Sequence, residues 1–381
     1  MSTSKKIFFI SLTLFCLALL FFGIYNLAFK KPIETAPAVE QKAPTVVTPV
    51  TPPKVSTDPI VAISEEAVLA PTLTSDAKAL KYYAKNSGRV YQIDFDGNSK
   101  RTLSDKELFG LNAVLWSPDK NKVITKMTSA GRTKFSSYDY LEAKNTILSD
   151  NIEDVVWQKN TNRIFYKYYD PKTKKRTLNI SDPDGANWKK LAELSVPSVF
   201  VQIPGSGMLS FWNKPDAFFE TTLRSISLIG GEEKMLLRGL FGADYLWNNN
   251  GTTTLVSHAD TKGGTKIQLS LVNSNGGELR NLNLPTLASK CVWLRDNKTI
   301  YCALPGEIPL SAIMPNDYDQ EKFHTADTFW KIDTTTGEKS RIIDLNKITG
   351  KYDATNLFLD ATENILFFTN RLDGKLYRIT L

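Results

Sequence analysis

The sequence predicts an all-β fold, a β-propeller of seven four-stranded blades, because a short apolar motif recurs at the spacing of a blade. The seven copies of the motif end at Ala70, Trp116, Trp157, Val201, Trp247, Trp293 and Leu359. Successive copies lie about 41 to 46 residues apart, a period typical of four-stranded blades. The last step is roughly 20 residues longer than the others, which indicates one insertion.

Each motif is followed by the other elements of a blade in a constant order. A polar turn and a second apolar run come first, as at residues 122–125, and such a pair is typical of adjacent antiparallel strands. In the first repeat a third strand is expected at residues 89–94 and a fourth at residues 101–103. The turn Asp96-Gly97-Asn98 separates them, and its glycine adopts positive φ at little steric cost.

Closure of the ring is predicted from the two ends of the repeat region. The last repeat stops at Leu381 after its third strand, which leaves one blade edge unpaired and prone to aggregation. Residues 59–63 have strand character and precede the first motif, so we expect them to supply the missing outer strand. The alternatives are a six-bladed ring with residues 59–75 outside it, or an eight-bladed ring.

The turns resemble those of TolB-type and WD-like propeller repeats. Ser117-Pro118-Asp119-Lys120 follows their Ser-Pro-Asp-Gly turn except at Lys120, and residues 96–104 resemble their later Asp-Gly turn. The resemblance covers roughly residues 66–381. It implies a propeller that binds protein across one face or at the mouth of its channel, although such folds serve many functions.

Residues 1–31 are predicted to form an N-terminal signal-anchor transmembrane segment. Residues 7–29 carry no charge, are rich in Phe and Leu, and lie between Lys5-Lys6 and Lys30-Lys31. At about 1.5 Å per residue this stretch is long enough to cross a hydrocarbon core of about 30 Å. A cleavable signal peptide is the alternative, but its apolar region normally has only about 7 to 15 residues.

Residues 32–58 are predicted to form a disordered linker, because they are rich in Pro, Thr, Val and Ala and poor in large apolar side chains. Such stalks typically hold an extracytoplasmic domain away from its membrane. We therefore expect a single-pass topology with a cytoplasmic N-terminus and an extracytoplasmic propeller at residues 59–381.

The charge of the chain does not indicate nucleic-acid binding. A net charge of +7 favours acidic partners in general. The basic residues, however, are scattered among nearly as many acidic ones and form no stripe with interleaved aromatic residues. An envelope protein or polymer is therefore the expected partner.

The sequence offers little catalytic chemistry. It has two histidines and contains no Gly-x-Ser-x-Gly elbow, Cys-x-x-Cys pair, His-Glu-x-x-His motif or Gly-rich phosphate loop. The aspartates at residues 94–98 and 182–185 occupy expected blade turns and lack the ligand spacing of an EF-hand. We therefore expect no catalytic residue, no metal site, no cofactor and no enzymatic activity.

Cys291 and Cys302 are a candidate disulfide pair. If residues 295–298 form a hairpin turn, counting outward along both strands places the two cysteines opposite each other. Facing residues have Cα atoms about 4.5 to 5.5 Å apart, which a disulfide accepts. The alternative is two unbridged small apolar residues in the core of a blade.

The insertion at residues 305–327 is the first candidate binding region, since long loops on a rigid scaffold often carry binding residues. Its candidate residues are Asp317, Tyr318, Phe323, His324 and Asp327. Tyr318 and Phe323 are suited to anchoring a peptide or a sugar, and a solvated loop without a site is the alternative. A second aromatic loop in the fourth blade adds Trp212 and Phe218 as candidates.

These observations predict a non-enzymatic, membrane-anchored extracytoplasmic propeller that binds a protein or polymer at the cell envelope. A propeller-class glycan hydrolase or lyase is the alternative, and it requires carboxylates or histidines at the starts of the inner strands. A ligand-sensing propeller is the third possibility, and it requires an enclosed pocket with convergent polar groups.

Overall fold

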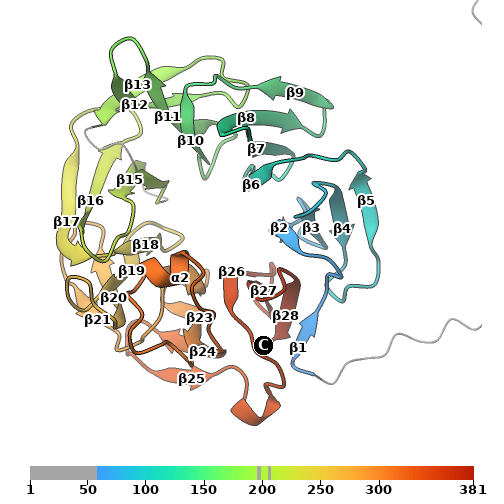
Figure 1. Ribbon diagram of the computed structural model, residues 1–381, viewed down its shortest axis with the longest axis vertical. Coiled ribbons are helices and arrows are strands. Elements are labelled where there is room, and N and C mark those ends of the chain that lie inside the picture. Colours follow the sequence, from blue (N-terminus) through green and yellow to red (C-terminus); the bar gives the residue numbers. More distant parts are fainter. Residues whose placement is uncertain (1–57, 195–198, 205–206) are drawn as a thin grey trace, which may run out of the picture. The chain divides into compact units, whose positions relative to one another are not determined.

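The chain folds into seven four-stranded antiparallel sheets, counted over the described residues, and these surround a central opening as the blades of a propeller (Figure 1). The structure is a computed structural model, and it describes residues 58–194, 199–204 and 207–381. The predicted seven-bladed ring is confirmed. All seven sheets belong to one compact unit, residues 54–381.

Four blades follow one another in the first part of the ring, each built from consecutive strands. Blade 1 comprises β2 (Val68–Leu73), β3 (Leu80–Ala84), β4 (Val90–Ile93) and β5 (Arg101–Ser104). Blade 2 comprises β6 (Leu111–Trp116), β7 (Lys122–Ser129), β8 (Arg132–Asp139) and β9 (Lys144–Ile147). Blade 3 comprises β10 (Ile152–Trp157), β11 (Ile164–Asp170), β12 (Lys175–Ser181) and β13 (Lys189–Leu194). Blade 4 comprises β14 (Val199–Gln202), β15 (Met208–Asn213), β16 (Glu220–Ser227) and β17 (Lys234–Phe241).

Three further blades complete the ring. Blade 5 comprises β18 (Asp244–Trp247), β19 (Thr253–Ala259), β20 (Ile267–Asn273) and β21 (Arg280–Asn281). Blade 6 comprises β22 (Cys291–Trp293), β23 (Thr299–Pro305), β24 (Asp327–Asp333) and β25 (Lys339–Arg341). Blade 7 comprises β26 (Ala354–Leu359), β27 (Ile365–Asn370), β28 (Leu376–Thr380) and β1 (Ile60–Ala62).

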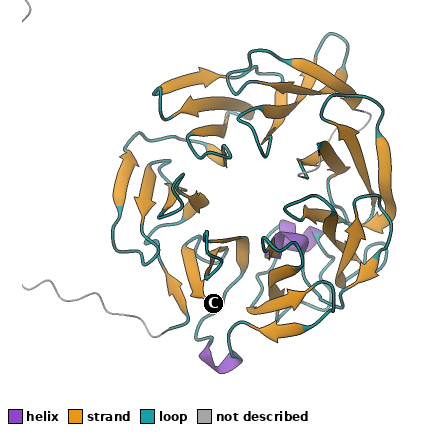
Figure 2. Ribbon diagram, turned by 180° about the vertical axis from the view of Figure 1, so that it is seen from behind, coloured by secondary structure: helices purple, strands orange, loops and turns teal. Residues whose placement is uncertain are grey.

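The short helical segments of the described chain lie in the last blades, as the view from behind shows (Figure 2). They are α2 (Asn316–Asp319), η1 (Ala288–Lys290) and η2 (Leu345–Lys347).

The recurring tryptophans join neighbouring blades. The indole Nε1 of Trp116 donates to the carbonyl of Ala70, and that of Trp157 donates to the carbonyl of Leu115. Trp293 repeats the contact with the carbonyl of Leu246 in blade 5. Each indole, half-buried in Trp116 and Trp157 and buried in Trp293, thus combines a large apolar surface with one satisfied donor. This contact explains why the motif ends in Trp so often.

Ring closure occurs as predicted, through the N-terminal strand. β1 pairs antiparallel with β28, with Ile60 opposite Ile379 and Ala62 opposite Tyr377. Ile60 is buried in the core shared by blades 6 and 7, and the hydroxyl of Ser64 accepts the N–H of Leu376. The edge left by the last repeat is therefore covered.

The turn that departs from the Ser-Pro-Asp-Gly pattern keeps its geometry without glycine. Lys120 adopts φ of 65°, the left-handed conformation that glycine would take. The side chain of Asp119 accepts the N–H of Asn121 and the hydroxyl of Ser117, which stabilises the turn. In this turn, the hydrogen bonds of Asp119 therefore stabilise the backbone next to the left-handed Lys120.

The predicted transmembrane segment at residues 7–29 and the linker up to residue 57 lie outside the described residues. In the part of the chain that the structure describes, no helix has the length and apolar character needed to cross a membrane.

Candidate functional site

One face of the ring collects charged side chains at the starts of the inner strands. Asp154 and Asp244 each lie three residues before the Trp that ends their inner strand, and Lys290 has the same place before Trp293. Adjacent blade strands are antiparallel, so the connection from the second strand to the third lies at this same end. The insertion between β23 and β24 shares this face, which we call the insertion face.

The insertion folds back over blade 5 and reaches blade 4. The backbone N–H of Met314 donates to the carbonyl of Gly264 in the loop that joins β19 to β20. The side-chain oxygen of Asn316 in α2 accepts the N–H of Ala217 at 2.8 Å, and its amide nitrogen donates to Asp216 at 3.1 Å. These contacts hold α2 at the inner side of the ring (Figure 1).

The insertion also has an apolar interior. Met314 and Tyr318 are buried against Ile267 and Leu287, and Phe323 packs half-buried at the edge of this cluster. The rings of Tyr318 and Phe323 lie 5.9 Å apart between centroids. Burial of large side chains stabilises the insertion, so it is a packed part of the propeller.

A buried ionic network fixes the end of the insertion, and Lys290 lies at its centre. Its Nζ lies 2.7 Å from a carboxylate oxygen of Asp327 and 2.7 Å from one of Asp353. It also donates to the hydroxyl of Thr325 and to the carbonyl of Ala354, each at 3.1 Å. Burial by itself lowers the pKa of Lys290, but Asp327 and the other nearby groups outweigh it and raise that pKa. The side chain is 1% exposed and carries a paired charge.

Asp353 accepts hydrogen bonds from three groups of the insertion as well. The hydroxyl of Tyr318 lies 2.6 Å from Oδ1, that of Thr325 lies 3.0 Å from it, and Nδ1 of His324 lies 3.1 Å from Oδ2. Burial alone raises the pKa of Asp353, but Lys290 and the hydrogen bonds from Tyr318 and His324 lower it to about 2. Asp353 is therefore an ionised carboxylate that ties the insertion to blade 7.

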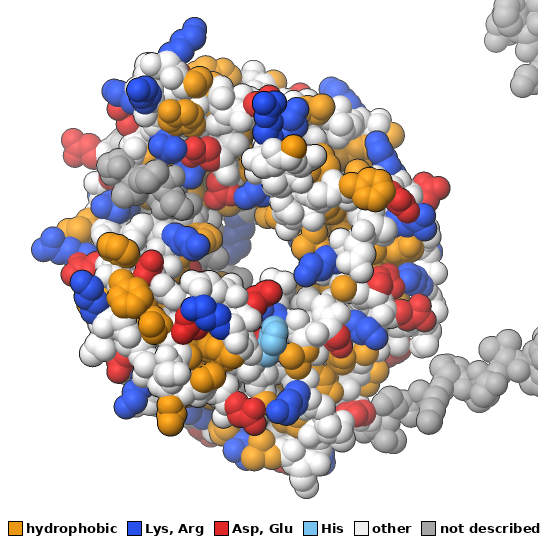
Figure 3. All heavy atoms as spheres, viewed as in Figure 1, with side chains coloured by type: hydrophobic (Ala, Val, Ile, Leu, Met, Phe, Trp, Pro, Cys, Tyr) orange, Lys and Arg blue, Asp and Glu red, His pale blue; other side chains and the backbone are white. Residues whose placement is uncertain are grey.

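The exposed rim of this network is polar. The His324 side chain is 38% exposed, and Glu321, three residues earlier in the chain, is exposed as well. The guanidinium of Arg371 lies 4.2 Å from the ring centroid of Tyr318 and donates to Glu321 at 3.3 Å. Around the central opening, the face shown in Figure 3 mixes acidic and basic side chains. The rim therefore offers hydrogen-bond donors and acceptors, and it carries both positively and negatively charged groups.

Two carboxylates lie between the insertion and blades 4 and 5. Burial raises the pKa of Asp244 to about 6, although its carboxylate accepts the indole N–H of Trp212 at 3.0 Å. Asp319 of α2 adds to this increase by charge repulsion. Desolvation by neighbouring groups also raises the pKa of Asp319, against the attraction of Arg371 and Lys214, although the residue is exposed.

The structure brings together some of the predicted binding residues and separates others. Tyr318, His324 and Asp327 meet around Lys290 and Asp353, and Phe323 packs next to them. Tyr318 and Asp327 are buried, so the role that the structure shows for them is to hold the insertion. A contact between these residues and a ligand stays a prediction.

The other predicted residues lie apart from this network. Asp317 pairs with Lys322 at 2.6 Å and accepts the N–H of Ile313, which shapes the insertion locally. Trp212 is buried against Tyr245, whereas Phe218 is exposed on its loop.

Lys290, Asp353, Arg371 and Asp244 were not predicted as site residues. A signal for two of them exists in the sequence, since the charged residue three places before Trp recurs at Asp154, Asp244 and Lys290. No comparable pattern marks Asp353 or Arg371.

The two cysteines of blade 6 face each other as the predicted hairpin requires. Cys291 is opposite Cys302 in the register of β22 and β23, and the structure joins them in a disulfide. Both side chains are buried in the core shared with blade 5.

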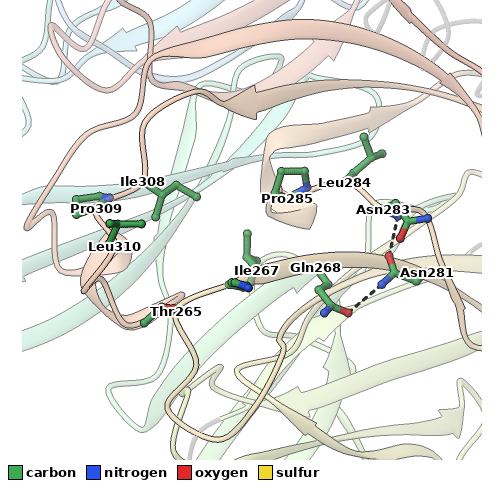
Figure 4. A pocket seen from close by; sticks show the side chains of 11 residues that line it. Thr265, Ile267, Gln268, Asn281, Asn283, Leu284, Pro285, Ile308, Pro309 and Leu310 are labelled. Atoms are coloured by element: carbon green, nitrogen blue, oxygen red, sulfur yellow. Dashed lines mark hydrogen bonds between the residues drawn. The ribbon is translucent and has the colours of Figure 1, made fainter.

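On its outer side, the insertion borders a cleft of about 380 Å³ beside blade 5 (Figure 4). Its apolar lining residues are Ile267, Leu284, Pro285, Ile308, Pro309 and Leu310. Leu310 is 97% exposed, so a large apolar side chain projects from the insertion next to an apolar cleft. At the end of the cleft away from Leu310, the polar side chains form hydrogen bonds with each other. The amide of Asn281, for example, donates to the side-chain oxygen of Gln268 at 2.9 Å.

In residues 58–194, 199–204 and 207–381, no three His, Cys, Asp or Glu side chains converge on a point that would hold a metal ion. The second histidine, His258, is buried and lies within hydrogen-bond distance of Ser270 and of the carbonyl of Ala259.

The comparisons with known proteins agree on the fold. Neither a protein-family model nor a curated protein matches the chain. An oligogalacturonate lyase from Vibrio parahaemolyticus is similar at a TM-score of 0.59 and 9% identity, over 84% of this chain and 93% of that one. An oligogalacturonate lyase in complex with manganese is similar at a TM-score of 0.58 and 11% identity, with the same coverage of both chains.

A third solved structure is the β-propeller domain of the Trilobed protease from Pyrococcus furiosus, which has an open velcro topology. It is similar at a TM-score of 0.52 and 13% identity, over 82% of this chain and 95% of that domain. The predicted resemblance to known propellers is thereby confirmed as a resemblance of fold. At these identities the likeness does not extend to activity.

Proposed function

We propose that the protein is a membrane-anchored, extracytoplasmic propeller that binds an envelope protein or polymer through its insertion and catalyses no reaction. The observation that carries this proposal is the exposed Leu310 beside an apolar cleft, on an insertion that is packed rigidly against the ring. A protein partner fits this chemistry best.

Rigidity of the insertion supports a binding role. Met314 and Tyr318 anchor it to blade 5, and Lys290 and Asp353 fix its end to blades 6 and 7. A binding surface that is already ordered loses little conformational entropy when its partner arrives.

The cleft beside the insertion supports a protein as the partner. Its volume of about 380 Å³ is large enough to receive an apolar side chain of a partner. Ile308, Pro309 and Leu310 lie together along this cleft, and a contiguous exposed apolar patch often marks an interface. An apolar side chain of the partner would fill the cleft and cover Leu310.

Capture of the partner tests this proposal. The full-length protein carries an affinity tag at its C-terminus, is cross-linked to its neighbours in cells and is then purified. The Leu310→Asp and Ile229→Asp variants are treated separately in the same way. Ile229 is also exposed but lies in the turn between β16 and β17 of blade 4. We expect one envelope protein to be recovered with the wild type and the Ile229 variant and lost with Leu310→Asp. Equal recovery with all three proteins would place the binding surface elsewhere.

Membrane anchoring is tested separately. If residues 1–31 are an uncleaved anchor and residues 32–58 a stalk, protease added to spheroplasts should release a fragment close to residues 59–381. Complete protection of the propeller, or a mature N-terminus near residue 30, would contradict this topology.

A glycan hydrolase or lyase is the second candidate, and one observation favours it. Asp154 and Asp244 lie at equivalent inner-strand starts, and burial raises the pKa of both carboxyl groups. A carboxyl group with a raised pKa is suited to general acid catalysis near neutral pH. Release of reducing ends from uncharged and uronate oligosaccharides by the wild type, and its loss in Asp244→Asn, would establish this activity.

A further inference from the structure

A second cleft lies between blades 2 and 3, on the side of the ring away from the insertion's own blade. Its volume is about 680 Å³. Blade 2 supplies Ile147 at the end of its outer strand β9 and Leu148 directly after it, and blade 3 supplies the face of β11, β12 and β13. We call this cleft the blade 2–3 groove. The proposed partner surface does not include any of its residues.

The floor of the groove is one face of this sheet, and its side chains lie in rows across the strands. One row consists of Tyr168, Thr177 and Glu193, which lie opposite one another on the three strands. The next consists of Tyr166, Asn179 and Lys190. The floor therefore has aromatic side chains on β11 and hydrogen-bonding side chains on β12 and β13.

Asn179 provides an unused acceptor in this floor. The residue is 2% exposed, and its Nδ2 donates to the hydroxyl of Thr177 at 3.0 Å. Its Oδ1 has no hydrogen-bond partner among the described residues. A buried polar atom without a partner is unfavourable. Asn179 lines the groove, so a rotation of its amide that brings Oδ1 to a ligand donor gains a stabilising contact.

Trp188 forms an exposed aromatic wall at the rim. It lies in the loop between β12 and β13 and is 65% exposed, although tryptophan is usually largely buried. Lys175 and Lys190 both pair with Glu193, at 3.1 and 2.8 Å, and Asp170 and Asp184 also line the groove, so its charged groups are of both signs. The groove thus presents an aromatic face and hydroxyl, amide and charged groups without a dominant charge.

The groove is not suited to binding an extended peptide by strand addition. The floor is the face of a sheet, and the central strand β12 is paired with β11 on one side and β13 on the other. Its backbone groups are therefore unavailable for strand addition, the common mode by which extended peptides bind sheets. Recognition has to come from side chains.

From these features we infer that the blade 2–3 groove binds an uncharged oligosaccharide. The apolar face of a pyranose ring packs on Trp188, and its hydroxyl groups supply the donor for Asn179 Oδ1 and acceptors for Lys175 and Lys190. The balanced charge of the rim fits an uncharged glycan better than an acidic one.

Calorimetric titration of the full-length protein in lipid nanodiscs tests this inference. The probes are hexasaccharides of β-1,4-linked N-acetylglucosamine, β-1,4-linked glucose, α-1,4-linked glucose and β-1,4-linked xylose, with hexagalacturonate as the acidic comparison. A mixture of ten-residue peptides represents the other class of ligand. At least one uncharged hexasaccharide should bind with a Kd below about 1 mM, about the weak end of specific recognition.

Three variants show whether the binding occurs in the groove. Trp188→Ala should weaken binding by about tenfold or more, since it removes the stacking surface. Asn179→Leu should also weaken binding while leaving the protein at least as stable, because it removes an unpartnered buried atom. Phe109→Ala, at another exposed aromatic residue outside the groove, should change the Kd by less than about twofold.

Several outcomes would overturn the inference. They are no binding of any uncharged hexasaccharide, binding of hexagalacturonate or the peptides alone, and binding that Trp188→Ala leaves unchanged.

Discussion

The ammonium group of Lys290 lies 2.7 Å from a carboxylate oxygen of Asp353, and this pair joins the start of the inner strand of blade 6 to that of blade 7. Both side chains are almost completely buried. The same ammonium group pairs with Asp327 at the end of the insertion. Two blades and the insertion therefore share one buried charge.

Removal of Lys290 should destabilise the propeller strongly. Lys290→Met leaves two buried carboxylates without their cation, and breaking a buried pair in this way typically costs about 3–5 kcal/mol. Urea unfolding of residues 54–381, the compact unit that contains all seven sheets, measures the loss. As the control, Lys347→Met breaks the exposed pair between Lys347 and Asp344 and should cost less than about 1 kcal/mol. Similar losses for the two variants would contradict this account of the network.

The parts of the fold that were predicted correctly depend on local patterns. The alternation of apolar and polar residues and the positions of the turns predicted the seven blades. They also predicted that the strand containing Ile60 pairs with the last strand. The same counting placed Cys291 opposite Cys302, because their hairpin is short and its turn is recognisable. Register inside a hairpin follows from its turn alone.

The candidate site was less predictable because its contacts are distant in sequence. Lys290 and Asp353 are 63 residues apart, and neither has a local pattern that indicates its partner. The insertion could be recognised by its length, but the burial of Tyr318 depends on Ile267 and Leu287 of other segments. Sequence alone therefore identified the insertion without showing that its aromatic residues are packed.

Closure of the ring through Ile60 should contribute measurably to stability. Ile60 is buried between blades 6 and 7, so Ile60→Ala should lower the free energy of unfolding by about 2–5 kcal/mol. Val61 is the matched control, because it lies next to Ile60 on the other face of β1 and is only half-buried. A loss for Val61→Ala as large as that for Ile60→Ala would contradict closure by this strand, whereas deletion of residues 32–56 should leave the stability unchanged.

The disulfide between Cys291 and Cys302 should be detectable and stabilising. The intact bridge lowers the mass of the protein by about 2 Da relative to the dithiol and protects both cysteines from alkylation before reduction. It closes a loop with a sequence separation of 11 residues, for which the loss of chain entropy predicts about 2–3 kcal/mol of stability. Urea unfolding with and without reductant measures this contribution. Alkylation of both cysteines in the native, unreduced protein would show that the bridge is absent.

The raised pKa of Asp244 predicts that part of the stability depends on pH. Its ordinary pKa of 3.8 rises to about 6 in the folded protein, so between these values the folded state binds more protons than the unfolded state. Stability supplied by the protonated carboxyl group is therefore present at about pH 4 and is lost as the pH rises through about 6. A shift of about two pKa units corresponds to at most about 3 kcal/mol, and the remaining exposure of the group reduces this to about 1–3 kcal/mol.

Asp244→Asn should remove this pH dependence. Asparagine keeps an oxygen that can accept the indole N–H of Trp212, but it cannot ionise. The stability of the variant relative to the wild type should therefore increase by about 1–3 kcal/mol between about pH 4 and pH 7, as measured by urea unfolding. Asp150→Asn, at an exposed aspartate, serves as the control and should show no such trend. A constant difference between Asp244→Asn and the wild type over this range would show that Asp244 is ionised throughout and that its environment is more polar than its burial indicates.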